Sequence, residues 1–357
     1  MIAPFEYAAS PARIVFGAGR ARDVAAEVAR LGAARALVVA TAGQRVAAEA
    51  IAAALGPQCA ATFLEAAMHT PVAVTERALA VAQAHACDAV VAVGGGSAIG
   101  LAKALALRTD WPQVVLPTTY AGSEATPILG ETRDGRKATQ RSPRVLPEVV
   151  IYDVELTLSL PVAVSTTSGM NALAHAVEAL YARDANPLTS ALAEEAIAAL
   201  ARSLPRIVAD PRDANARSEA QYGAWLAGTC LGTVGMALHH KLCHVLGGTF
   251  DLPHAPTHAV LLPHAAAYNA PAAPAAMRRV ARALGTGDAV AGLAQLARTL
   301  GVPRSLREIG MPASGLDRAA DLAVQDAYWN PRPLERAALR ALLGAAFAGD
   351  PPGEGKR

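Results

Sequence analysis

The sequence lacks long apolar runs, blocks of like charge and paired cysteines. Hydrophobic residues make up 53% of the 357 positions. No stretch approaches the roughly twenty uncharged apolar residues of a membrane span, so we expect none. The net charge is only +2, and no basic block interleaved with aromatics points to nucleic acid. The four cysteines form no CxxC pair and are too sparse for a disulfide framework.

The first residues also lack the basic start and apolar run of a secretory signal, so we expect a cytoplasmic protein. Aromatic residues are scarce at 4%, whereas Ala and Leu dominate, which suits helices that pack through small side chains. The length is sufficient for two domains with separate cores, and it favours an enzyme.

Short β-branched runs alternate with helical stretches in the first part of the chain. The runs lie at 13–19, 34–42, 88–95, 113–119 and 148–153, and the helical stretches include 44–55 and 71–86. This alternation predicts a Rossmann-like parallel sheet covered by helices on both faces. An Asp-Gly turn signal within 132–138 predicts a hairpin. We therefore expect an α/β domain over residues 1–157.

Strand patterns nearly vanish after this point. Ala/Leu-rich helical segments follow at 167–182, 187–203, 215–247, 272–284, 288–300 and 334–347. They predict an all-α domain over residues 158–357.

Two loops in the α/β part carry nucleotide-binding signals. A buried strand is followed by Gly94, Gly95, Gly96 and Ser97 and then by a helix, which is typical either of a phosphate-binding turn or of a tight strand–helix turn. The next strand leads into "PTTYAGSEAT", where Thr118, Thr119 and Ser123 offer hydroxyls or simply cap a helix. Two such loops at successive strand ends favour a shared dinucleotide site.

A third position bears on the cofactor. The strand end at Thr41 has no Asp or Glu to bind a ribose 2′-hydroxyl, and Arg45 follows closely. Without that carboxylate a 2′-phosphate is not repelled. We expect NADPH to be accepted alongside NADH.

Six of the nine histidines fall between residues 239 and 264, which indicates a site. His240 and His244 are four apart and share a helix face, and His254 follows after a loop. Upstream, Asn171 and His175 have the same spacing on an apolar helix. The pattern resembles a metal site, except that Asn171 stands where a carboxylate is expected.

These motifs, with "LPEVVIYDVELT", "GMNALAHAVEA" and "CHVLGGTFDLPH", resemble the iron-containing (group III) alcohol dehydrogenase superfamily. The resemblance covers essentially the whole chain and implies a dehydroquinate-synthase-like fold. In metal-dependent members an Asp and three His bind Fe²⁺ or Zn²⁺. Those positions match Asn171, His175, His240 and His254, and His244 matches a further active-site histidine near the nicotinamide.

Within the superfamily, "MHTPV", "HHKLCHVLGGTFDLPHA" and "YWNPRP" resemble the maleylacetate reductase branch. That branch implies reduction of the conjugated C=C of maleylacetate to 3-oxoadipate in the degradation of aromatic compounds, without a metal. Members of the superfamily are often dimers, so we expect a homodimer. The resemblance also places Lys137 near the nucleotide ribose or nicotinamide. Because the substrate carries two carboxylates, we expect Lys241 and Arg332 to bind it, with His69 lining the site.

The chemistry agrees with a metal-free site. An Asn at position 171 removes the negative charge that compensates a divalent ion, although three histidines alone can still hold zinc. Hydride addition to an enone produces an enolate, which hydrogen-bond donors can stabilise and a histidine can protonate. We expect His244 or His175 to be the proton donor.

Two alternatives remain at this stage. The first is a metal-dependent alcohol dehydrogenase with an Asn/His/His/His site, which metal analysis and alcohol oxidation assays would separate. The second is a non-catalytic protein that senses a nucleotide or a ring-cleavage product. The dense histidine cluster argues against a sensor, because a sensor needs no proton donors.

Overall fold

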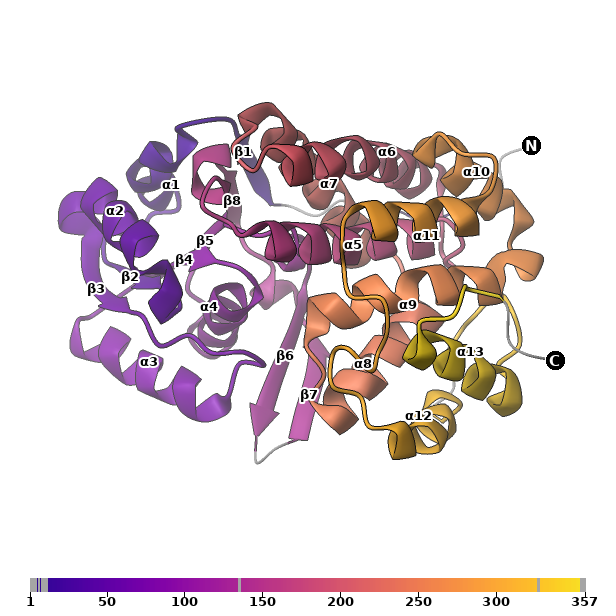
Figure 1. The fold of residues 1–357 in the computed structure, drawn as a ribbon. Helices are drawn as coiled ribbons and strands as arrows, with labels where there is room; N and C mark the ends of the chain where they lie inside the picture. Colours follow the sequence, from indigo (N-terminus) through magenta and orange to yellow (C-terminus); the bar gives the residue numbers. More distant parts are fainter. Residues whose placement is uncertain (1–4, 6, 8–11, 134–135, 326–327, 354–357) are drawn as a thin grey trace. The chain divides into compact units, whose positions relative to one another are not determined.

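The computed structural model describes residues 5, 7, 12–133, 136–325 and 328–353. The chain divides between Leu160 and Pro161 into two compact units, which we call the sheet unit and the helical unit (Figure 1). The predicted boundary after residue 157 falls at the end of the short 3₁₀ turn Val154–Thr157. Among the described residues, no helix is both long and apolar enough to span a bilayer.

The sheet unit contains six parallel strands in the order β1-β8-β5-β4-β2-β3. The strands are β1 (Arg13–Phe16), β2 (Ala36–Val39), β3 (Cys59–Phe63), β4 (Ala89–Gly94), β5 (Gln113–Pro117) and β8 (Val149–Tyr152). The parallel sheet is as predicted, but β3 was not expected from the sequence.

Helices cover both faces of this sheet. Successive side chains of a strand point to opposite faces, so a strand can pack against helices on both sides. Val91 and Val93 of β4 pack in one core with α1 (Val24–Arg30) and α2 (Arg45–Leu55). Val90 and Ala92 pack in another core with α3 (Val72–Ala84) and α4 (Gly96–Thr109). The continuous apolar run of β4 therefore reflects burial on both faces.

The predicted hairpin is present in the sheet unit. Strands β6 (Ile128–Arg133) and β7 (Arg136–Arg141) pair antiparallel, with Arg133 opposite Arg136. The Asp-Gly turn signal at residues 134–135 lies outside the described residues.

The helical unit confirms the predicted all-α part. Its helices are α5 (Val162–Ala179), α6 (Pro187–Ala209), α7 (Ala214–Thr233), α8 (Leu238–Phe250), α9 (His254–Asn269), α10 (Pro274–Leu284), α11 (Ala289–Thr299), α12 (Leu316–Ala323) and α13 (Arg336–Ala348). The segment 215–247, predicted as one helix, is divided between α7 and α8.

Helix α5 is the central element of this unit and positions its polar side chains. It is buried from Ser165 to Ala179 and packs against α6, α7 and α9. Gly169 permits the close approach of α6, because a Cβ at this position would lie 2.6 Å from a methyl carbon of Leu204. A helix buried on all sides cannot carry polar groups without partners, so each polar residue on α5 requires an explanation.

Candidate active site

Three polar side chains follow one face of α5: Asn171, His175 and Glu178. Their spacing of four and then three residues brings them above one another on successive turns. The sequence analysis identified Asn171 and His175 but missed Glu178. The same spacing was visible in "NALAHAVE", where the only polar residues are these three.

Glu178 and two histidines form a continuous hydrogen-bonded chain. Nδ1 of His240 lies 2.6 Å from Oε2 of Glu178, and Nε2 of His240 lies 2.7 Å from Nδ1 of His175. All three residues are buried. Because an ionised carboxylate can only accept, His240 carries a proton on Nδ1 and directs Nε2 at His175.

Glu178 also caps the start of α8. Its carboxylate accepts the backbone N–H of Ala237 at 3.0 Å and that of His239 at 2.9 Å. Helix N-termini leave such N–H groups unsatisfied and favour an anion. Burial alone would raise the pKa of Glu178. The hydrogen bond from His240, its positive charge and the backbone donors outweigh burial, so this pKa lies below its usual value.

Asn171 is 2% exposed, and its Oδ1 has no hydrogen-bond partner in the described part of the chain. A buried amide oxygen without a donor costs about 1–3 kcal/mol. Such an atom beside a histidine pair is typical of a site that a ligand completes.

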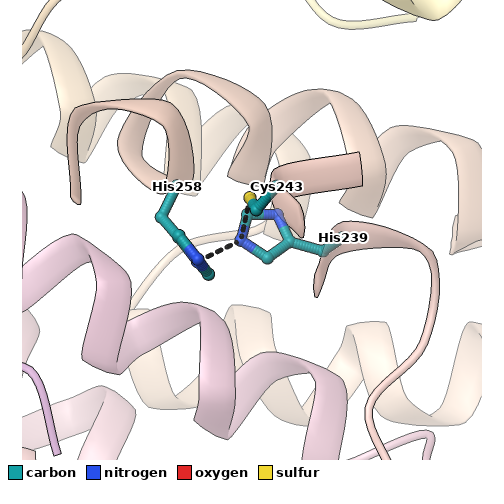
Figure 2. Close-up of side chains that lie close together, drawn as sticks. All are labelled: His239, Cys243 and His258. Atoms are coloured by element: carbon teal, nitrogen blue, oxygen red, sulfur yellow. Dashed lines mark hydrogen bonds between the residues drawn. The ribbon is translucent and has the colours of Figure 1, made fainter. Parts of the chain in front are cut away.

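A second histidine pair, His239 and His258, lies next to Cys243 (Figure 2). Nε2 of His239 is 2.9 Å from Nδ1 of His258 and 3.7 Å from the Cys243 sulfur, and all three side chains are buried. Burial lowers the pKa of His239 to about 3 and that of His258 well below its ordinary value. Burial, and then the charge of Glu178, raises the pKa of the Cys243 thiol. This second pair is therefore neutral near pH 7.

The His258 ring connects the two pairs. Its centroid lies 5.0 Å from that of His240 and 4.8 Å from that of His239. The His254 ring is 4.4 Å from it, at the start of α9. His244 lies one turn beyond His240 on α8, and both His244 and His254 are exposed. The structure thus brings His175, His240 and His254 around His258, a residue that the sequence analysis did not assign to the site.

The four residues that match metal ligands offer a divalent ion no carboxylate to balance its charge. Asn171 supplies an amide in place of a carboxylate, and Nδ1 of His175 and Nε2 of His240 are hydrogen-bonded to each other at 2.7 Å. Among the His, Cys, Asp and Glu side chains of the described ranges, only His239, Cys243 and His258 bring three ligand atoms within 4.8 Å of one another.

That buried set does not offer a catalytic metal site either. Its two imidazoles already share a proton, and the far nitrogens, Nδ1 of His239 and Nε2 of His258, lack the outer partner that metal-bound histidines have. All three residues are buried, which leaves no open coordination position for a substrate.

Two predicted substrate-binding cations lie in the helical unit and have partners there. Nζ of Lys241 sits 5.5 Å from the centroid of the Tyr328 ring. Nη1 of Arg332 donates to the Tyr268 carbonyl at 3.1 Å, and the guanidinium carbon lies 4.3 Å from the centroid of the Tyr268 ring. These contacts order both side chains, and their role in substrate binding stays a prediction.

The predicted nucleotide loops of the sheet unit lie at one edge of the sheet. Thr118 and Thr119 follow β5, and Gly94–Ser97 connects β4 to α4, with β4 and β5 adjacent. The two loops touch, because a Cβ on Gly95 would lie 2.8 Å from the Thr119 methyl carbon. Thr118 is 1% exposed, and its Oγ1 has no partner within the described residues.

Thr41, the third position with a predicted role in cofactor binding, lies at the same edge of the sheet. Thr41 follows β2, and its turn approaches the glycine loop, since a Cβ on Gly94 would lie 3.9 Å from Cγ of Gln44. From β2 the sheet continues to β3, whereas from β4 it continues the other way to β5. Open α/β sheets bind ligands at such a switch point, at the carboxyl ends of the strands.

The other site residues predicted in the sheet unit, Ser123, Lys137 and His69, lie in three different segments. Ser123 begins the 3₁₀ turn Ser123–Ala125, and Lys137 lies within β7, where it pairs with Thr132. His69 lies before α3, in the connection that follows β3. Its φ is 62° and that of Thr70 is 46°, both left-handed, and α3 begins only at Val72. Two successive left-handed non-glycine residues are strained, which is frequent at functional sites.

Known proteins resemble the chain over nearly its whole length. Residues 11–154 match the iron-containing alcohol dehydrogenase family. Residues 165–347 match the C-terminal part of the Fe-containing alcohol dehydrogenase family. A maleylacetate reductase from Rhizobium sp. (strain MTP-10005) is 57% identical over 349 residues, 98% of this chain and 99% of the relative.

Two further relatives agree. A maleylacetate reductase from Sphingobium indicum is 56% identical over 348 residues, 98% of this chain and 99% of the relative. The crystal structure of maleylacetate reductase from Agrobacterium tumefaciens superposes with a TM-score of 0.95 at 57% identity, covering 98% of this chain and 100% of that chain. The chain is therefore an oxidoreductase that belongs to the iron-containing alcohol dehydrogenase family and groups with its maleylacetate reductases.

Proposed function

We propose that the protein reduces the conjugated C=C of maleylacetate to 3-oxoadipate with NADH or NADPH, and that it does so without a metal ion. Identity of 56–57% to maleylacetate reductases over 98% of the chain supports the substrate. The observation that carries the metal-free proposal is Asn171, which places an amide with an unpaired Oδ1, in place of a carboxylate, one helical turn before the hydrogen-bonded His175.

The sheet unit is proposed to bind the dinucleotide at the carboxyl edge of β2, β4 and β5. The N–H groups at the start of α4 suit a phosphate, and the unpaired Oγ1 of Thr118 suits a polar group of the cofactor. The bound nicotinamide supplies a hydride to the alkene carbon β to the ketone, which leaves an enolate on the substrate. The residues of this chain then supply one proton.

We assign the proton transfer to the Glu178–His240–His175 chain. Glu178 holds Nδ1–H of His240, so a proton on Nε2 of His240 can pass to Nδ1 of His175. At the same time His175 releases the proton of its own Nε2 to the α carbon of the enolate. His240 ends neutral, and a solvent proton restores the chain. A general acid of this kind accelerates reactions by about 10²–10⁴-fold.

The hydrogen bonds favour His175 over His244 as the final donor. His175 is linked through His240 to the buried carboxylate, whereas His244 is exposed on the next turn of α8. The substrate carboxylates are proposed to contact Asn171, Lys241 and Arg332, with His254 and His69 lining the site. A cytoplasmic homodimer remains the expectation for the assembly.

Product analysis tests the proposed function. Purified protein should oxidise NADH or NADPH when maleylacetate is added and form 3-oxoadipate in equal amount. Oxidation of simple alcohols at a comparable kcat/KM, with no turnover of maleylacetate, would support a metal-dependent alcohol dehydrogenase instead. Tight binding of maleylacetate without any turnover would support a sensor.

A further inference from the structure

A lysine of the sheet unit is buried among backbone oxygens. Lys103 lies on α4, seven residues after Gly96 and therefore on the same side of the helix, and it is 1% exposed. Lysine is almost never fully buried unless its ammonium is paired. The sequence analysis assigned no role to Lys103.

The ammonium of Lys103 is enclosed by four oxygen atoms from one loop. Nζ lies 2.6 Å from the Ser123 carbonyl, 2.7 Å from that of Thr126 and 3.0 Å from that of Ile128. The Thr126 hydroxyl is the fourth, at 3.0 Å. An ammonium has three N–H donors, so every donor has an acceptor. Converging carbonyl oxygens are also the groups that replace the hydration shell of K⁺ in proteins.

A buried carboxylate belongs to the same network. Glu124 is 1% exposed and accepts the hydroxyl of Tyr152, at the end of β8, at 3.0 Å. Burial lowers the pKa of Lys103 to about 7, and the charge of Glu124 opposes this shift. The carbonyl oxygens also favour the charged amine.

The loop whose carbonyl oxygens surround Lys103 is the second loop that the sequence predicts to bind the nucleotide. At its start, Thr119 packs against Gly95, one residue before α4 begins. At its end, Lys103 binds the carbonyls of residues 123–128 two turns further along the same helix. The unpaired hydroxyl of Thr118 lies next to the first attachment, one residue before Thr119.

We propose that Lys103 is a positioning residue for the dinucleotide, and that its ammonium serves as a built-in monovalent cation for the loop 118–128. This inference rests on the proposed use of NAD(P)H. Removing the side chain while keeping the oxygens leaves a site for a monovalent cation of similar size, K⁺ or NH₄⁺. The loop, and with it NADH affinity, then depends on that cation.

The experiment measures NADH affinity of Lys103→Ala by fluorescence titration in N-methylglucamine buffer, with and without KCl or NH₄Cl. Without small cations we expect the affinity to fall about tenfold, because a charged hydrogen-bonding group has been lost. KCl or NH₄Cl should restore most of it, and tetramethylammonium should not. At saturating NADH, kcat should stay within about twofold of wild type, because the proton-transfer residues are untouched.

Two controls accompany the variant. Lys103→Met fills the space with an uncharged chain, so NADH affinity should be weak and no cation should restore it. Arg108→Ala removes a cation of α4 that bonds Ala104 and Glu131 instead of the loop, and it should bind NADH like wild type in every buffer.

Wild-type affinity of Lys103→Ala without small cations overturns the inference, and so does weak affinity of folded Lys103→Ala that no cation restores. If Lys103→Ala fails to fold in all buffers, Lys103→Met decides: weakened NADH binding supports the inference, and wild-type binding overturns it. Failure of the wild-type protein to bind NADH or NADPH contradicts the proposed function, which is a separate result.

Discussion

Both units of the molecule contain a buried ionisable side chain that is held by several hydrogen bonds, but the partners differ. Glu178 in the helical unit is surrounded by two backbone N–H groups and an imidazole. Lys103 in the sheet unit is surrounded by carbonyl and hydroxyl oxygens. An imidazole accepts and releases protons near pH 7, whereas a carbonyl does not. The first arrangement is therefore suited to proton transfer, and the second to holding a loop.

The largest effect is expected where the proton path is cut without disturbing Glu178. In His240→Asn the amide can stand in place of Nδ1 and still donate to the carboxylate, but nothing replaces Nε2. We expect kcat to fall about 10²–10⁴-fold, as for loss of a general acid. Steady-state kinetics measures it, with His264→Asn as a control of the same substitution on α9. A His240→Asn variant with wild-type kcat would break the proposed chain.

The stability contributions of two buried glutamates, Glu178 and Glu124, should respond oppositely to pH. The pKa of Glu178 is lowered on folding, so its stabilisation is present above about pH 4.5 and is lost as pH falls through its folded-state pKa. The pKa of Glu124 is raised, mainly by burial, so the stability of the folded chain decreases as pH rises from 4.5 towards its folded-state pKa.

Urea unfolding of Glu178→Gln and Glu124→Gln across pH 4–7 measures this contrast. Glu178→Gln should lose about 1–3 kcal/mol near pH 7, and less on acidification below 4.5. Glu124→Gln should be closest to wild type at the acid end. Asp184→Asn, which alters a carboxylate that accepts the N–H of Gly235 in the α7–α8 connection, is the control for lost capping. Parallel pH profiles for both glutamates would contradict the contrast.

A smaller effect is expected for restoring the carboxylate at position 171. In Asn171→Asp a negative charge faces a dianionic substrate, so KM for maleylacetate should rise about tenfold, because like charges at close range repel. Binding of Zn²⁺ should strengthen at the same time. Asn186→Asp, a buried N-cap position where Asp serves equally well, is the matched control. An unchanged KM would remove Asn171 from the substrate site.

The smallest effect is expected at Arg332. Lysine at this position keeps the charge but loses the planar stacking on Tyr268, so KM for maleylacetate should rise only about threefold, with kcat unchanged. If Arg332→Lys and Arg332→Ala both leave KM unaltered, the arginine only orders the segment 328–333.

The fold could be predicted where the sequence patterns are strong. The β-branched runs of β4 and β5 identified the parallel sheet, whereas β3, "CAATF", consists mostly of small residues without a strand signal. Helix α9 escaped prediction because Pro256 and Pro263 interrupt its pattern. The first proline lies in the first turn, where it is tolerated, and the second stands inside a helix supported by tertiary packing.

The site was predicted from histidines and glycines, whose spacing is visible in sequence. Glu178 was missed because its role comes from contacts with α8, which lies about sixty residues further along the chain. Lys103 was missed for a similar reason, since a lysine in an apolar helix shows its partners only when the loop folds over it. Spacing reveals side chains on one helix, but pairing across elements requires the fold.

The central claim, that proton transfer through histidines takes the place of a metal ion, is tested most directly by chelation. The rate of NADH oxidation with maleylacetate is measured before and after exhaustive dialysis against a chelator, with metal content determined in the same samples. We predict that the rate is unchanged and that neither Fe²⁺ nor Zn²⁺ raises it. A rate that disappears on dialysis and returns only with Fe²⁺ or Zn²⁺ would contradict the account.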